Sequence, residues 1–202
     1  MVDLHRLEPP HVDAVARMFA IAFHDDPGYT AVFPDPATRP AGLITLFAAL
    51  LRLRLRGGST TWLAGSSEAP TGAISAAPSE VRFGLRDQLS AGLLTAPLRW
   101  GLTATMQMHR ADVQVGELRR ACEPALPHTW VAQIAVHPDH QKKGIGGALL
   151  RQVLDDAADQ PTALMTTAPE NPAWYRRFGF EERGRQDIDA GFTAWFLVHE
   201  PR

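Results

Sequence analysis

Two lysines and three glycines stand in one short turn, where their types and spacing could bind an anion. The turn reads Lys142-Lys143-Gly144-Ile145-Gly146-Gly147. Glycine lets the backbone adopt unusual dihedrals and approach a ligand closely. A helix N-terminus offers unpaired N–H groups and a partial positive charge. If a helix begins here, the turn is suited to cradling a phosphate; the same composition is also typical of an exposed loop that binds nothing.

The flanking residues predict a strand before this turn and a helix after it. Residues 130–136 are apolar apart from Gln133 and are followed by Pro138, as in a buried strand. After the turn, apolar residues recur at helical spacing at 149, 150, 153, 154 and 157. A dinucleotide fingerprint is excluded because its third glycine position is Leu149, and no Gly-Lys pair exists for a P-loop.

The pattern Gln-x-x-Gly-x-Gly at residues 141–146, after the strand end 134–138, resembles the acetyl-CoA loop of the GNAT superfamily of N-acetyltransferases. A second stretch, 171–180, resembles the second motif of that superfamily. Its spacing from Tyr175 to Gly179-Phe180 matches, while Asn171 lies closer to Tyr175 than the usual form has it. The resemblance covers roughly residues 130–184, and two motifs in order are more specific than either alone.

The resemblance implies a site for acetyl-CoA as co-substrate. The strand backbone would lie along the pantetheine, the turn would hold the pyrophosphate, Gln141 would orient the turn, and Asn171 would contact the pantetheine or the acetyl end. Many members have glycine at position 142, where this chain has lysine. The implied cofactor-binding residues are Ile134, Ala135, Val136, Gln141, Lys142, Lys143, Gly144, Ile145, Gly146, Gly147 and Asn171.

Acyl transfer to an amine requires proton transfers. An alkylamine resembles lysine, with a pKa of about 10.4, so something must remove its proton before attack. By the resemblance, Tyr175 would protonate the leaving CoA thiolate; the sequence alone favours a Trp-Tyr pair that packs a short helix. The family often places a glutamate where this chain has Trp130, so the base is open, with Glu123, His128 and His109 as candidates.

Composition limits the other classes of function. The chain has 202 residues, a net charge of −2 and a single cysteine, Cys122. We therefore expect no nucleic-acid partner, no internal disulfide and no metal site, because neither H-x-x-x-H nor C-x-x-C spacing occurs. No apolar leader or membrane-length stretch is present, which predicts a cytoplasmic protein without a membrane partner. The Ala, Arg, Pro and Gly usage suggests a bacterial genome.

The predicted fold class is α/β, a mixed, mainly antiparallel sheet with helices on both faces, in a single domain of residues 1–202. We expect N-terminal strands and helices in 1–78, a helical insertion in 79–127 and the acetyl-CoA-binding half in 128–202. Residues 24–29 are expected to form a polar loop, and Arg52, Arg54 and Arg56 a solvated helix end. The remaining elements are expected as strands at 2–7, 60–64, 72–76, 163–167, 180–187 and 192–199, and as helices from 9, at 40–56 and at 171–178.

Acetylation of a primary amine on a small molecule, by direct attack in a ternary complex, is the leading hypothesis. The insertion suggests a cover over the acceptor, as in members similar to puromycin N-acetyltransferase, and no acidic run suits a basic peptide. Acetylation of a protein N-terminus or lysine is the alternative among enzymes, and a non-catalytic acyl-CoA-binding module is the alternative outside them. The chain is expected to be a monomer or a homodimer.

Overall fold

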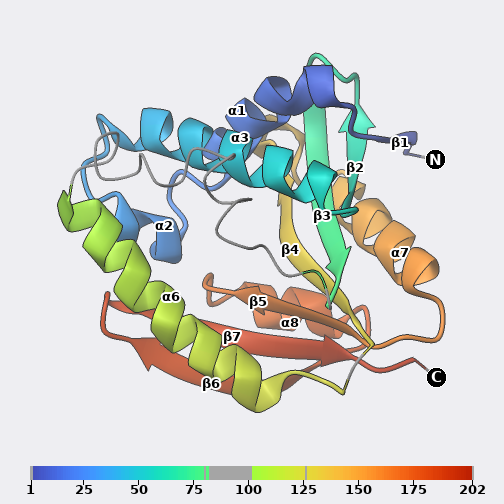
Figure 1. Cartoon of the computed structure of the whole chain (residues 1–202). Coiled ribbons are helices and arrows are strands. Elements are labelled where there is room, and N and C mark those ends of the chain that lie inside the picture. Colours follow the sequence, from blue (N-terminus) through green and yellow to red (C-terminus); the bar gives the residue numbers. More distant parts are fainter. Residues whose placement is uncertain (1, 80, 82–101, 126, 202) are drawn as a thin grey trace.

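The computed structural model describes residues 2–79, 81, 102–125 and 127–201, which form one seven-stranded sheet flanked by helices (Figure 1). The strand order is β1-β2-β3-β4-β5-β7-β6. All neighbouring strands are antiparallel except β4 and β5. The predicted fold class is confirmed. The strands are β1 Leu4–Arg6, β2 Thr60–Gly65, β3 Pro70–Pro78, β4 Thr129–Val136, β5 Thr162–Thr166, β6 Phe180–Ile188 and β7 Phe192–His199.

Helices cover both faces of the sheet. Helices α1 and α3 and, further along the sheet, α6 lie on one face, whereas α7 and α8 lie on the other (Figure 1). Each helix buries one apolar face against the strands, as the 3.6-residue spacing requires. The helices are α1 Val12–Ala22, α2 Pro27–Val32, α3 Arg39–Arg56, α6 Leu102–Cys122, α7 Ile145–Ala157 and α8 Asn171–Arg176, with 3₁₀ turns at Pro9–His11 and Pro138–His140.

Most predicted elements are present with small shifts of their ends. The strand expected at 2–7 is limited to Leu4–Arg6, and the helix expected at 171–178 ends at Arg176. Helix α6 forms the second half of the predicted helical insertion. Residues 80, 82–101 and 126 of that insertion lie outside the described residues. Among the residues that the structure describes, no helix combines the length and apolar character needed to cross a bilayer.

Two predictions in the N-terminal half are wrong. The stretch expected as a polar loop turns into helix α2, because the Asp26 side chain accepts hydrogen bonds from the backbone N–H groups of Gly28 and Tyr29 and Pro27 occupies the first helical position. Arg54 does not belong to a solvated helix end, because its Nη1 atom is buried. Arg52, two residues earlier, is exposed as expected and pairs with Asp13 at 2.7 Å.

Arg39 fixes the connection that carries α2. Its buried guanidinium donates hydrogen bonds to three backbone carbonyl oxygens, those of Phe33 at 2.7 Å, His24 at 3.0 Å and Pro34 at 3.0 Å. All three carbonyls lie in the two segments that flank α2, so one side chain holds both ends of this short helix. The position of Tyr29 within α2 therefore depends on a defined set of contacts.

Candidate functional site

The parallel strands β4 and β5 separate after three residue pairs. They pair from Thr129↔Thr162 to Val131↔Leu164, and β4 then continues to Val136. A register shift against β3 leaves Ala132 as an extra residue in β4, and such a bulge bends a strand and increases its twist. The two strands therefore open a gap along residues 132–136 of β4, where backbone polar groups are released from β5. Ile134, Ala135 and Val136 all lie along this gap.

The glycine-rich turn follows Val136, the last residue of β4, at the wide end of the gap. Gln141 donates from Nε2 to the carbonyl oxygen of Val136 at 3.3 Å, which fastens the turn to the strand. Lys142 has a φ of 61° and Gly144, which caps α7, has a φ of 82°. Two left-handed residues this close together turn backbone N–H groups toward one side, which is the geometry of an anion-binding nest. Lys143 donates from Nζ to the carbonyl oxygen of Asp139 at 2.9 Å.

The first turn of α7 is packed closely against α8. A Cβ atom on Gly146 would lie 3.4 Å from the Trp174 ring, and one on Gly147 would lie 3.2 Å from the Phe178 ring. Ile145, in contrast, is buried beneath the turn. Glycine at 146 and 147 therefore lets α8 approach the N-terminus of α7, and the two motifs recognised in the sequence meet in space.

Tyr175, in helix α8, is buried on the same face of the sheet as α7. Its side chain is buried in one apolar cluster with Val131 and Leu164, the last paired residues of the two strands. Its ring contacts those of Trp174 and Phe180 at centroid distances of 4.8 and 5.6 Å. Burial raises the pKa of the Tyr175 phenol well above its usual value. A phenol is protonated at neutral pH, as a proton donor must be, and burial makes the Tyr175 hydroxyl a weaker acid than a phenol in water.

Asn171 begins α8 and contacts the end of β5. Its Nδ2 atom donates to the hydroxyl of Thr166 at 2.7 Å. Asn171 therefore stands on the β5 side of the gap, whereas the glycine-rich turn stands on the β4 side. The structure thus brings the predicted strand residues, the turn, Asn171 and Tyr175 together around one opening.

Helix α2 approaches the gap from the face of the sheet that carries α1 and α3, opposite to α7 and α8. Asp26 accepts hydrogen bonds from the Thr167 hydroxyl at 2.9 and 2.8 Å, just beyond the end of β5. Tyr29, in the same helix, makes a side-chain hydrogen bond with Gln133 of β4. The sequence analysis placed Asp26 and Tyr29 in a polar loop and predicted neither contact, although Asp26-Pro27-Gly28 has the composition of a helix N-terminus.

Two of the candidate bases lie together but apart from the turn. His128 is fully buried, and its Nε2 atom lies 3.1 Å from Glu123 Oε1. Arg119 donates to the same Glu123 oxygen from Nε and Nη2 at 2.9 and 2.7 Å and stacks over Trp130. At about 3.3 Å per strand residue, His128 is roughly 10 Å before Val131 and about 20 Å before Ile134. These residues lie at the closed end of the β4–β5 pair.

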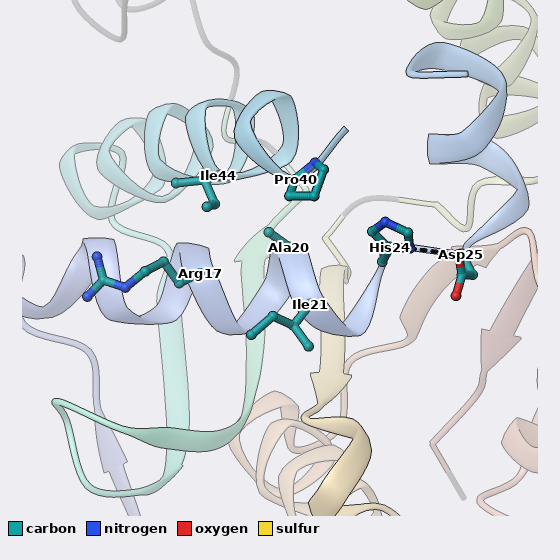
Figure 2. A pocket seen from close by; sticks show the side chains of 7 residues that line it. All are labelled: Arg17, Ala20, Ile21, His24, Asp25, Pro40 and Ile44. Atoms are coloured by element: carbon teal, nitrogen blue, oxygen red, sulfur yellow. Dashed lines mark hydrogen bonds and ion pairs between the residues drawn. The ribbon is translucent and has the colours of Figure 1, made fainter. Parts of the chain in front are cut away.

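A separate pocket lies between α1 and α3 (Figure 2). None of the predicted site residues lines it, and His24 and Asp25 at its edge pair with each other at 2.7 Å. Within the described ranges, no group of three or more His, Cys, Asp or Glu residues is arranged to hold a metal ion. The lining residues are Arg17, Ala20, Ile21, His24, Asp25, Pro40 and Ile44.

Comparison with known proteins gives one consistent result. Residues 106–182 match the family model described as an acetyltransferase (GNAT) domain. The S-(2-succino)cysteine N-acetyltransferase of Bacillus subtilis (strain 168) is 34% identical over 85 residues, which cover 38% of this chain and 50% of that relative. The match thus spans half the length of the curated relative.

Solved structures share the fold over the whole chain. A crystal structure described as histone acetyltransferase HPA2 and related acetyltransferase, from Corynebacterium glutamicum, superposes with a TM-score of 0.73 at 19% identity, covering 100% of this chain and 98% of that one. The ribosomal-protein-S18-alanine N-acetyltransferase of Escherichia coli gives 0.54 at 14% identity, covering 100% and 94%. At these identities the likeness concerns the fold.

Proposed function

We propose that the chain is an acetyltransferase of the GNAT type, whose domain model matches residues 106–182, and that it transfers the acetyl group of acetyl-CoA to a primary amine of a small molecule. Acetyl-CoA is the co-substrate of GNAT acetyltransferases. The observation that carries the proposal is the gap between β4 and β5, which opens beside a turn with left-handed residues at Lys142 and Gly144. An elongated thioester cofactor whose pantetheine arm is joined to a pyrophosphate matches this combination.

The roles of the chain's own residues follow from their places. Backbone N–H groups of the turn and of the α7 N-terminus would bind the pyrophosphate, and the opened edge of β4 would pair with the pantetheine amides. One N–H group of Ile134, Ala135 or Val136 would stabilise the oxyanion that forms on the thioester carbonyl. Gln141 would hold the turn against β4, as its bond to Val136 already does.

In the chemical step, the amine nitrogen attacks the thioester carbonyl, a C–N bond forms and the C–S bond breaks. The amine loses its proton to solvent or to a base, and the CoA sulfur takes a proton from the Tyr175 hydroxyl. A phenol is protonated at neutral pH, and the apolar cluster that Tyr175 shares with Val131 and Leu164, the last paired residues of β4 and β5, supports this role. Acetyl-amine and CoA are the products, and the phenolate regains its proton from solvent.

The surface on the acceptor side favours a small molecule. Helix α6 packs across β6 and β7 and reaches α2, and the bond between Asp26 and Thr167 ties α2 to the end of β5 (Figure 1). A peptide substrate needs an open groove at this place. The curated relative is named for acetylating a cysteine derivative, which is a small molecule.

Calorimetric titration with acetyl-CoA, with NAD as comparator, tests the cofactor site. We expect binding on the order of micromolar for acetyl-CoA and none for NAD. In a Gly144→Glu variant, binding should be lost because a carboxylate enters the phosphate cradle. Gly58→Glu is the matched control: both glycines have positive φ, 77° and 82°, and at both a Cβ would meet open space.

The second part of the test is turnover. A panel of small primary amines is incubated with acetyl-CoA, and release of the CoA thiol is followed. Acetylation of at least one amine supports the proposal. Binding of acetyl-CoA without turnover of any amine or peptide would favour the non-catalytic module, and turnover of peptides alone would favour a protein acetyltransferase. Absence of acetyl-CoA binding would overturn the proposal as a whole.

A further inference from the structure

Three polar side chains meet on the face of β4 that is turned toward α1–α3. Gln133 comes from β4, Tyr29 from α2 and Arg54 from the last turn of α3. Tyr29 is hydrogen-bonded to the Gln133 side chain, and its hydroxyl interacts electrostatically with the Arg54 guanidinium. The Tyr29 ring is fixed against Phe23 and Phe47 at centroid distances of 5.4 and 5.2 Å. The three residues therefore form a defined cluster.

This cluster contains two buried polar atoms whose hydrogen-bonding capacity is unused. Within the described residues, Nη1 of Arg54 and Oε1 of Gln133 are buried and have no hydrogen-bond partner. A buried polar group without a partner is costly, and a buried charge without one is more so. One atom is a donor and the other an acceptor, so a ligand that fills both must carry an anionic or acceptor group beside a donor.

Among the described residues, no acidic side chain forms an ion pair with Arg54. Burial lowers the pKa of its guanidinium to about 10, so it is still charged at neutral pH. The arginines that pair with an aspartate or glutamate in the described structure are Arg39, Arg52, Arg119 and Arg183. Arg54 is not among them. The neighbouring phenol is neutral at that pH, as phenols are, and burial raises its pKa further. A guanidinium fork matches the planar geometry of a carboxylate and can bind it through two parallel hydrogen bonds.

The position of the cluster connects it with the proposed reaction. Gln133 lies two residues past Val131, where pairing with β5 ends, so the cluster borders the gap. It faces α2, whereas Val131 and Ile134 face the cluster that contains Tyr175. An acceptor entering on the α2 side could thus place one end at Arg54 while its amine reaches the gap.

We infer that Tyr29, Arg54 and Gln133 form a subsite for a carboxylate group on the acceptor, so that the substrate is an amino acid or another amine bearing a carboxylate. This inference rests on the proposed function and narrows its substrate class. Arg54 binds the carboxylate, Gln133 Oε1 accepts a hydrogen bond from a donor on the acceptor, and Tyr29 holds both side chains in place. These are positioning and specificity residues that do not touch the acetyl group.

The test compares matched acceptors. L-amino acids and their carboxamides, for example L-methionine and L-methioninamide or L-phenylalanine and L-phenylalaninamide, are assayed by thiol release at saturating acetyl-CoA. We expect kcat/KM to be at least about 30-fold higher for the carboxylates. Arg54→Met should reduce this ratio to below about threefold, mainly through KM, with unchanged acetyl-CoA affinity. Arg52→Met, on the exposed side of the same helix, should keep the wild-type ratio.

Two further results decide the inference if Arg54→Met folds poorly. The ratio for the wild-type protein needs no variant, and Tyr29→Phe, which retains the ring contacts, should lower the ratio about three- to tenfold. Amines turned over without any preference for the carboxylate would overturn the inference and leave the proposed function intact. No acetyl-CoA binding, or no turnover of any amine, would overturn both.

Discussion

Asp26 accepts hydrogen bonds from the hydroxyl of Thr167 with both carboxylate oxygens, at 2.9 and 2.8 Å, although the two residues are 141 positions apart in the chain. The same carboxylate caps α2 by accepting from the backbone N–H of Gly28 at 2.9 Å. One half-buried side chain therefore sets the start of a helix and fastens that helix to the end of β5. The orientation of Tyr29 toward β4 depends on this double role.

Replacing Asp26 by asparagine should change how stability depends on pH. Burial raises the pKa of Asp26 above 3.8, against the opposing effect of its hydrogen bonds. The folded protein thus binds this proton more tightly than the unfolded chain does, and stability is lost as pH rises from the unfolded pKa through the raised one. Asparagine keeps the capping oxygen without a charge. Relative to wild type, Asp26→Asn should therefore gain unfolding free energy as pH increases from about 3.5 to 7.

The measurement is urea unfolding of both proteins across that pH range. Asp25→Asn is the control, because the Asp25 side chain is 90% exposed and should follow the wild-type curve. Parallel curves for wild type and Asp26→Asn would contradict the prediction, since they would mean that Asp26 has the same pKa in the folded and unfolded states.

The glycine-rich turn and its flanking elements could be predicted because their signals are local. The apolar run 130–136 and the helical spacing after Gly144 specify β4 and α7 within adjacent residues. The pairing of Tyr29 with Gln133 could not be found in this way, because it joins α2 to a strand a hundred residues later. Arg54 was misjudged for the same reason: its helical repeat suggested an end in solvent, and only the placement of α2 and β4 buries it.

Glu123→Gln should affect stability more than catalysis. Glu123 Oε1 accepts two hydrogen bonds from Arg119 and lies 3.1 Å from His128 at the closed end of the strand pair. The neutral amide removes the partner of a partly buried guanidinium, which should lower the unfolding free energy by about 2 kcal/mol. kcat should stay within about threefold, because Glu123 lies at the closed end of the strand pair. Loss of a catalytic base would instead lower kcat by about 100-fold or more.

Denaturant unfolding and steady-state kinetics on the same preparation separate these effects. Glu117→Gln, on the exposed side of α6, is the matched control and should change neither quantity. A drop in kcat of about 100-fold or more, with full structural stability, would instead identify Glu123 as the base that acts through ordered water.

Lys142→Gly should leave acetyl-CoA binding nearly unchanged. The φ of Lys142 is 61°, a conformation that glycine adopts without a steric penalty. If backbone N–H groups do the binding, loss of the ammonium group should change the dissociation constant by no more than about threefold. Gly144→Ala provides the contrast: its φ of 82° strains any Cβ although the space is open, so stability should fall by about 1 kcal/mol and binding should weaken. Calorimetry and thermal unfolding measure both, and a tenfold loss in Lys142→Gly would show that the ammonium itself binds phosphate.

Tyr175→Phe should lower kcat by about 100-fold without changing the affinity for acetyl-CoA. Phenylalanine keeps the ring contacts with Trp174 and Phe180, so the cluster at the start of the gap should remain folded, and unfolding in urea verifies this. Because burial raises the pKa of the phenol, it stays protonated as pH rises through its ordinary value of about 10. Below a pH of about 10, we therefore expect no decline in kcat that is present in the wild type and absent from Tyr175→Phe. A decline of that kind would mean that the phenol ionises in its ordinary range, and equal kcat in the two proteins would show that another group protonates the leaving sulfur.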